Sequence, residues 1–271
     1  MILLFLILVS FVNAYHQTDD LILKIISECE KTPELTYYMH EDIPVIDWRK
    51  DLSPDILWTF NEHARELITA ELALEMIMEL KYIKPERRVT IVPVVNVWGR
   101  KHVEKGNPCQ RTNVNGVDTN RNYPQKIIHK YKKGSQEYQG ETPLSEKETK
   151  LISSLIQQSK RYINVHSGEY SLYMPWDSST NLPPNHEIML ETLKNYSVYC
   201  PECTVGSASK KSFYKAYGTS VDYATTLGVE AYTFEIFGSN SFGCERMFNP
   251  KGFEYRIVLD KWKKIMALTL Q

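Results

Sequence analysis

The sequence predicts a single α/β domain built on a mixed, mostly parallel β-sheet with helices on both faces (an α/β/α arrangement). The chain has 271 residues, 42% of them hydrophobic, which is enough to fill one large core. Apolar runs such as 88–97 are continuous rather than alternating, as in strands that are covered on both faces. Strand-like runs also alternate with helical patterns, which is the order of parallel crossover units.

In the first 98 residues, Asp19 and Asp20 favour a helix start. Apolar residues at 67, 70, 74, 77 and 78 recur at helical spacing after a strand-like run. The elements expected here are a helix from Asp19 to about Lys31, extended segments at 35–39 and 44–48, a strand at 56–60, a helix from 67 to about 82 and a strand at 88–97.

Residues 99–133 are polar and rich in Asn, and a long loop of this kind inside a compact domain is usually functional. Ser145 to Glu148 matches a capping box. The elements expected after it are a helix to about Lys160, a strand at 161–166, a helix at 186–199, a loop at 204–218, a short helix at 219–227, a strand at 230–237 and a helix at 253–268.

The first 12 residues are almost wholly apolar and too short to span a bilayer, and Val12-Asn13-Ala14 offers small residues at the usual cleavage positions. We therefore expect a signal peptide at 1–14 and a secreted catalytic domain at 15–271, extracellular or in the lumen of the secretory pathway. A short uncleaved anchor is the alternative, because a positive n-region is missing. No other stretch is apolar enough to cross a membrane, and the net charge of −1 gives no reason to expect nucleic acid or an anionic membrane as partner.

Five cysteines in an exported chain predict one or two disulfides and one remaining thiol. The pairing stays open at this point. Cys200 and Cys203 form a C-x-x-C pair that suggests a second metal site or a redox pair, but a four-cysteine zinc site needs another close pair. The other three cysteines are scattered singly: Cys29, Cys109 and Cys244.

Several polar residues stand where predicted strands end. His63 and Glu66 follow the strand at 56–60, His166 ends the strand at 161–166, and Glu235 lies near the end of the strand at 230–237. Two histidines and a glutamate, with one position left for water, form a catalytic zinc set, and Glu235 then has the role of general base. Glu169 is an alternative ligand, although a helix start supports two ligands better than a bare strand end.

At these residues the chain resembles the zinc metallocarboxypeptidase (funnelin-like) family, and the linking segments look closest to its plant and protist branch. The matching motifs stand in the family's order and span residues 60–237. They are His63-Ala-Arg-Glu66, Gly116-Val-Asp-Thr-Asn120-Arg121-Asn-Tyr, Asn164-Val-His166-Ser, Tyr214 with Gly218-Thr-Ser-Val-Asp222-Tyr, and Thr233-Phe-Glu235.

The resemblance implies a metallocarboxypeptidase fold and one Zn²⁺ per chain, held by His63, Glu66 and His166. It implies that Glu235 takes the proton of the attacking water and passes it to the leaving amine. It also implies that Arg111 stabilises the oxyanion on the scissile carbonyl, with Arg100 as the alternative.

The same resemblance gives the substrate contacts. Asn120 and Arg121 would grip the terminal carboxylate, since a guanidinium fork supplies two parallel charged hydrogen bonds. Tyr214 would close over the bound residue. Arg65 and Ser167 would line the next subsite.

For specificity, the resemblance places Val221 at the base of the side-chain pocket. The other wall residues it implies are Phe213, Ala216, Thr219 and Thr233. An apolar pocket favours hydrophobic or aromatic terminal residues. Lysines at 210, 211 and 215 lie in the same loop and offer an alternative attraction for acidic ones.

Two departures from better-known relatives stand out. Asn61-Glu62 replaces the usual glycine before the metal motif, and the 48 positions between Ala14 and His63 are too few for an activation domain as well as the first catalytic elements. We therefore expect no pro-domain.

The sequence predicts a monomeric, secreted zinc carboxypeptidase acting on peptide or protein C-termini. The alternatives are a non-catalytic peptide-binding relative and a peptidase for acidic C-termini or wall peptides.

Overall fold

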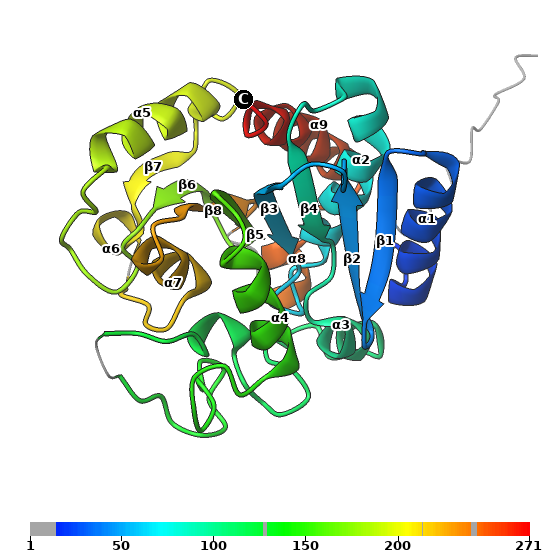
Figure 1. Ribbon diagram of the computed structural model, residues 1–271. Coiled ribbons are helices and arrows are strands. Elements are labelled where there is room, and N and C mark those ends of the chain that lie inside the picture. Colours follow the sequence, from blue (N-terminus) through cyan, green and yellow to red (C-terminus); the bar gives the residue numbers. More distant parts are fainter. Residues whose placement is uncertain (1–14, 127–128, 213, 240–242) are drawn as a thin grey trace, which may run out of the picture.

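The computed structural model describes residues 15–271 except 127–128, 213 and 240–242. The signal peptide predicted at 1–14 and the pocket residue Phe213 lie outside this part. In the described part, eight strands form one sheet in the order β1-β2-β4-β3-β5-β8-β6-β7 (Figure 1). The strands are β1 Leu35–His40, β2 Ile43–Trp48, β3 Pro54–Phe60, β4 Arg88–Val92, β5 Arg161–His166, β6 Tyr170–Met174, β7 Thr204–Ser207 and β8 Glu230–Ile236.

The centre of the sheet is parallel and its two sides are mixed. Strand β3 pairs in parallel with β4 and β5, and β5 with β8. The pairs β1–β2, β2–β4 and β6–β8 are antiparallel, and β6–β7 is parallel. The predicted mixed, mostly parallel sheet is therefore confirmed.

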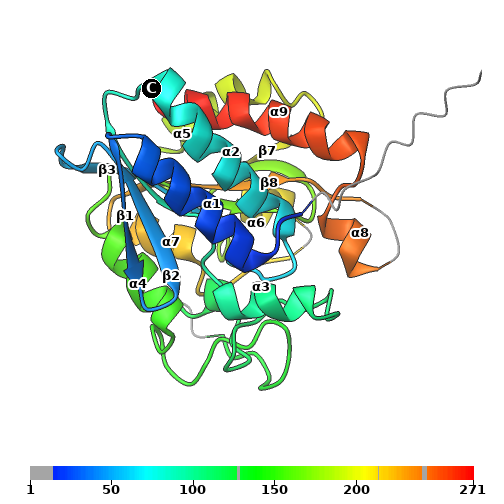
Figure 2. The same ribbon diagram turned by 90° about the vertical axis from the view of Figure 1, so that its right-hand side faces the viewer.

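Helices cover both faces of this sheet. Helices α2 and α9 pack side by side with α1 next to α2, whereas α7 packs on β5 and β8 (Figures 1 and 2). The helices are α1 Thr18–Lys31, α2 Leu67–Ile83, α3 Val97–Glu104, η1 Thr119–Arg121, α4 Lys147–Ile156, α5 His186–Ser197, α6 Ala208–Lys211, α7 Ser220–Thr226, α8 Cys244–Phe248 and α9 Phe253–Leu268. No helix in the described ranges is long and apolar enough to cross a bilayer.

The strand predicted at 88–97 is shorter than expected. It ends at Val92, and Pro93, which has no backbone N–H to donate, follows it. Beyond this point the backbone N–H groups of Val95 and Asn96 bond to the carbonyls of Phe60 and Asn61. The Asn96 side chain then caps α3 by accepting from Gly99 N, so the chain forms a helix where a loop was predicted.

The predicted capping box at Ser145 is wrong. Helix α4 begins at Lys147 with Glu146 as its N-cap residue, and no side-chain cap bond forms. Ser145 Oγ instead donates to Glu146 Oε1. The helix ends at Ile156, earlier than the predicted Lys160.

Strands β6 and β7 and the short helices α6 and α8 were not predicted. Strand β7 lies where a loop was expected and has only four residues, Gly206 among them. Strand β6 is held by pairing with β8, sixty residues further along the chain. Short strands of this kind depend on their partners more than on local propensity.

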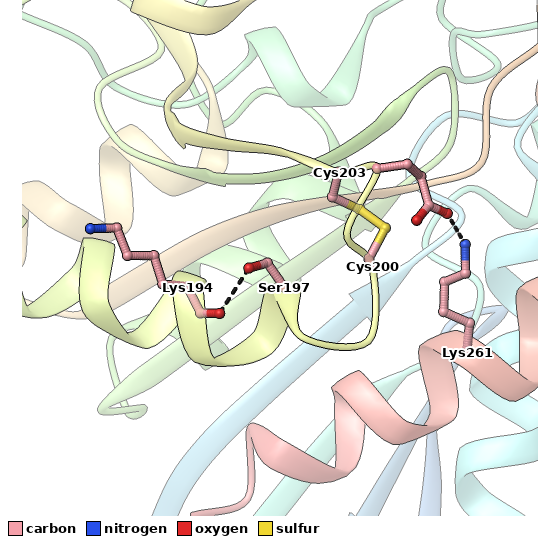
Figure 3. Close-up of a disulfide and its surroundings, with 6 residues drawn as sticks. Lys194, Ser197, Cys200, Cys203 and Lys261 are labelled. Atoms are coloured by element: carbon pink, nitrogen blue, oxygen red, sulfur yellow. Dashed lines mark hydrogen bonds and ion pairs between the residues drawn. A yellow bond between two sulfur atoms is a disulfide. The ribbon is translucent and has the colours of Figure 1, made fainter.

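Two disulfides and one thiol are present in the described part, as the cysteine count predicts. Cys109 bonds to Cys244, and Cys200 bonds to Cys203, while the buried Cys29 is free. The Cys200–Cys203 bridge closes the turn after α5, and Glu202 within that turn pairs with Lys261 of α9 (Figure 3). Because both sulfurs are bonded to each other, the suggestion of a metal site at this pair is wrong.

Candidate functional site

Three neighbouring parallel strands bring the predicted site residues to one edge of the sheet. Strand β3 ends at Phe60, and the loop through Glu66 leads into α2. Strand β5 ends at His166, and Glu235 of β8 is its partner in the register. Because parallel strands end at the same edge, residues far apart in sequence meet there.

His63, Glu66 and His166 converge on one point. Each offers a ligand atom within 4.8 Å of the others, and all three residues are buried. His63 Nδ1 lies 2.8 Å from Glu66 Oε1, His166 Nδ1 lies 3.0 Å from Glu66 Oε2, and the two Nδ1 atoms are 3.1 Å apart. Two imidazole nitrogens and a carboxylate are the protein ligands of a catalytic zinc site. The donor set and its convergence therefore fit one Zn²⁺.

The outer nitrogens of both histidines face polar groups. His63 Nε2 lies 3.2 Å from Asp118 Oδ1, and His166 Nε2 lies 3.3 Å from Asn120 Nδ2. A carboxylate bonded to Nε2 fixes the orientation of the ring and leaves Nδ1 free to bind the metal. The sequence analysis assigned Asp118 no role, although it stands in the same motif as Asn120.

The electrostatics of the cluster stabilise an ionised Glu66 and a protonated His166, whose proton a metal ion would displace on binding. Burial opposes charge on His166, but the Glu66 carboxylate outweighs it and raises the pKa of His166 to about 9. Burial likewise opposes charge on Glu66, yet the two imidazoles lower the pKa of this carboxyl. Glu66 is therefore ionised at neutral pH, which is the form that binds a metal.

The loop that carries these ligands is shaped by Asn61. Asn61 has φ 53°, a left-handed conformation that favours glycine and tolerates asparagine. Its Nδ2 donates to the carbonyls of His63, Ala64 and Glu66 at 3.0–3.3 Å. The replacement of the usual glycine thus keeps the backbone conformation and adds three hydrogen bonds under the metal ligands.

Replacing Asn61 with alanine is expected to lower the free energy of unfolding by about 3 kcal/mol, because left-handed strain is added and three hydrogen bonds are lost. Urea unfolding in the presence of chelator measures this without a contribution from metal. Asn61→Gly is the matched control, since it loses the same bonds without the strain. Equal stability of the two variants would contradict the role given to backbone strain.

Glu62 is a buried carboxyl behind the metal cluster. Asn164 Nδ2 donates to Glu62 Oε2 at 2.7 Å, and the same oxygen is 3.9 Å from His166 Nε2. Burial raises the pKa of Glu62, against the opposing effect of both histidines. Glu62 therefore places a carboxyl group, whose ionisation is opposed by burial, on the outer side of His166.

Glu235 faces the cavity beside the metal cluster with one unpaired oxygen. Within the described residues, Glu235 Oε2 is buried and has no hydrogen-bond partner. Burial raises the pKa of Glu235 to about 8, with the charges of Glu66 and Glu169 acting in the same direction and that of His166 against it. A carboxyl group with this pKa takes up and releases a proton near neutral pH, as a general base must.

The two candidate arginines for the oxyanion lie in different places. Arg111 lines the cavity, and its Nε donates to Asp118 Oδ2 at 2.8 Å. Arg100 is fully buried elsewhere, where it donates to the carbonyls of His16 and Leu67 and pairs with Glu71. Only Arg111 is therefore placed to reach a substrate.

These groups surround a cavity of about 470 Å³. Arg121 is 3% exposed, and its Nε has no hydrogen-bond partner in the described part of the chain. Its Nη1 donates to Asn120 O, and Asn120 Oδ1 accepts from Ser220 N, which fixes both residues. The predicted residues lining the cavity are His63, Arg65, Glu66, Arg111, Asn120, Arg121, His166, Ser167, Glu169, Tyr214, Ala216, Thr219, Thr233 and Glu235.

Further subsite residues are anchored by α8. The Arg65 guanidinium lies 4.2 Å from the centre of the Phe248 ring, and Ser167 Oγ donates to Phe248 O. Tyr214 is 56% exposed on the loop after α6.

Val221, which the resemblance places at the base of the side-chain pocket, is buried. Its side chain is 1% exposed and belongs to the hydrophobic core, and it is not among the described residues that line the cavity. Asp177, which follows β6, lines the cavity. The sequence analysis missed Asp177, because strand β6 was not predicted.

The class that these features define is a metal-dependent peptidase of the α/β type. Residues 46–256 match the family described as zinc carboxypeptidase, and the chain therefore belongs to the zinc carboxypeptidase family. The predicted resemblance is confirmed at this level, while the plant and protist branch stays a prediction.

Among curated relatives, human mast cell carboxypeptidase A is 29% identical over 56% of this chain and 42% of its own length. Bovine carboxypeptidase B2 is 25% identical over 86% of this chain and 65% of its own length. The chain thus spans 42% to 65% of the length of these relatives.

Solved structures show the same fold at low identity. Bovine thrombin-activatable fibrinolysis inhibitor, in complex with tick carboxypeptidase inhibitor, superposes with a TM-score of 0.83 at 23% identity, covering 94% of this chain and 96% of that one. Carboxypeptidase A from Helicoverpa armigera gives a TM-score of 0.79 at 18% identity, covering 94% and 73%.

Proposed function

We propose that this protein is a secreted, monomeric, zinc-dependent carboxypeptidase that hydrolyses the last peptide bond of peptides and proteins. The observation that carries the proposal is the shared cavity, which is lined by the metal cluster together with Glu235 and Arg121. Among the described residues, Glu235 Oε2 and Arg121 Nε have no hydrogen-bond partner. Two disulfides support an oxidising, exported setting.

Each residue has a defined part in this reaction. Arg121 and Asn120 bind the terminal α-carboxylate, which limits cleavage to the last bond. Glu235 Oε2 takes a proton from the attacking water and delivers it to the leaving amine. Arg111 stabilises negative charge on the scissile carbonyl oxygen. When bound by His63, Glu66 and His166, Zn²⁺ would polarise that carbonyl and acidify the water.

Removal of zinc tests the proposal. Dialysis against 1,10-phenanthroline is expected to reduce hydrolysis of a blocked dipeptide to background, and one equivalent of Zn²⁺ is expected to restore it. The reason is that the His63, Glu66 and His166 side chains alone contain no electrophile that could polarise the scissile carbonyl. The measurement is release of the terminal amino acid together with zinc content. A zinc-loaded protein that retains peptides without cleaving any of them would instead indicate the non-catalytic binding relative.

The two side-chain preferences expected from the sequence stay predictions. The apolar preference was argued from Val221, which belongs to the hydrophobic core, and from wall residues of which Ala216, Thr219 and Thr233 line the cavity. The acidic preference depended on Lys210, Lys211 and Lys215, none of which is among the described residues lining the cavity.

A further inference from the structure

One carboxyl group in the cavity has no part in the proposed reaction. Asp177 lines the cavity and is 8% exposed. Four of the other side chains that line the same cavity are short: Ala208, Ser212, Ala216 and Thr219. Short walls leave room for a long substrate side chain that reaches toward the carboxyl group.

Asp177 is held in place by its neighbour Asp222. The backbone N–H of Asp177 donates to Asp222 Oδ1 at 2.8 Å, and Ser178 donates to Asp222 Oδ2 through N at 3.1 Å and Oγ at 2.6 Å. The carbonyl of Asp177 accepts from Ala216 N at 3.1 Å. Asp222 is therefore occupied with the backbone, whereas the carboxyl of Asp177 lines the cavity.

No cation of the described chain neutralises Asp177. In the described ranges it forms no ion pair within 4.0 Å with a lysine or arginine. Burial raises the pKa of Asp177 to about 7, and the charge of Asp222 adds to this, while Thr219, Arg121 and His166 act in the opposite direction. A buried carboxylate is costly unless a cation or a proton compensates it.

We propose that the cavity accepts a C-terminal lysine or arginine, whose side-chain cation pairs with Asp177 while its α-carboxylate binds Arg121. This inference rests on the proposed carboxypeptidase function. The charge of Arg121 acts on both Asp177 and Asp222, so the two carboxyl groups and the arginine lie within electrostatic range of each other. A terminal basic residue carries the complementary pair of charges, one at each end.

The test compares blocked dipeptides that differ only in the last residue, with zinc present. The wild type is expected to show kcat/KM at least about 30-fold higher for C-terminal arginine or lysine than for leucine. Asp177→Asn should reduce this ratio by a similar factor, because it removes the charge but keeps the shape. Asn at 177 also relieves repulsion with Asp222, so the variant is expected to fold.

Glu169→Gln is the matched control, since it removes another carboxylate that lines the same cavity. It should leave the arginine-to-leucine ratio largely unchanged. An equal fall in both variants would overturn the assignment to Asp177. A wild type that cleaves leucine substrates as well as arginine substrates would overturn the inference alone, whereas cleavage of no substrate would overturn the proposed function.

The same ratio should depend on pH. Asp177 becomes charged as the pH rises through its pKa of about 7, and only the charged form attracts a cation. The arginine-to-leucine ratio is therefore expected to rise by up to about tenfold between pH 6 and pH 8. Titration of Glu235 affects both substrates and cancels in the ratio. A ratio that is flat in wild type, or that rises equally in Asp177→Asn, would contradict the inference.

Discussion

Replacing Glu235 with glutamine is expected to lower kcat by about 10³-fold, because the amide cannot take the proton of the attacking water. The side chain keeps its size, so the cavity and the register of β8 with β5 should stay intact. Steady-state hydrolysis of the best substrate in the panel measures the effect.

Zinc content provides the control for this variant. Glu235 is not one of the three converging ligands, so Glu235→Gln should still bind one Zn²⁺ per chain and should bind substrate with a Kd close to the wild-type KM. Loss of zinc together with activity would show that Glu235 is needed to hold the metal. Retention of wild-type kcat would remove it from the proton-transfer step.

Replacing Arg121 with methionine is expected to lower kcat/KM by about 100-fold or more for peptides with a free C-terminus, because a buried charged partner of the carboxylate is lost. The sharper readout is discrimination between a free and an amidated C-terminus. Wild type should cleave the amidated peptide poorly, and the variant should lose much of this preference.

Arg65→Met is the matched control, since Arg65 also lines the cavity but stacks on Phe248. It should change kcat/KM for longer peptides while keeping the preference for a free C-terminus. If Arg65→Met abolishes that preference and Arg121→Met keeps it, the carboxylate binds at the other arginine.

The central sheet and the long helices could be predicted from sequence alone. Helix α9 begins and ends where its amphipathic pattern does, and α2 ends one residue beyond the prediction. The parallel strands β3, β5 and β8 were recognisable as continuous apolar runs that end in polar residues. The metal cluster followed from the same pattern, because parallel strands that end together bring their last residues to one edge.

Shorter elements could not be predicted, because their stability depends on distant partners. Strand β6 forms against β8, and β7 forms against β6. The missed strand β6 hid Asp177, which follows it. Helix α3 likewise depends on the cap supplied by Asn96 and on backbone bonds to the end of β3.

The sequence by itself predicted the fold class, the three residues that converge in the metal cluster and the proposed general base, since each follows from residue types placed at the ends of strong apolar runs. Only the tertiary structure decided between Arg111 and Arg100, paired Cys109 with Cys244, moved Val221 into the core and placed Asp177 in the cavity. The physical reason is the separation along the chain over which each signal acts. The pattern that predicts a strand lies within about five or six neighbouring residues. In contrast, the direction in which a loop residue points depends on contacts with segments far away in the chain.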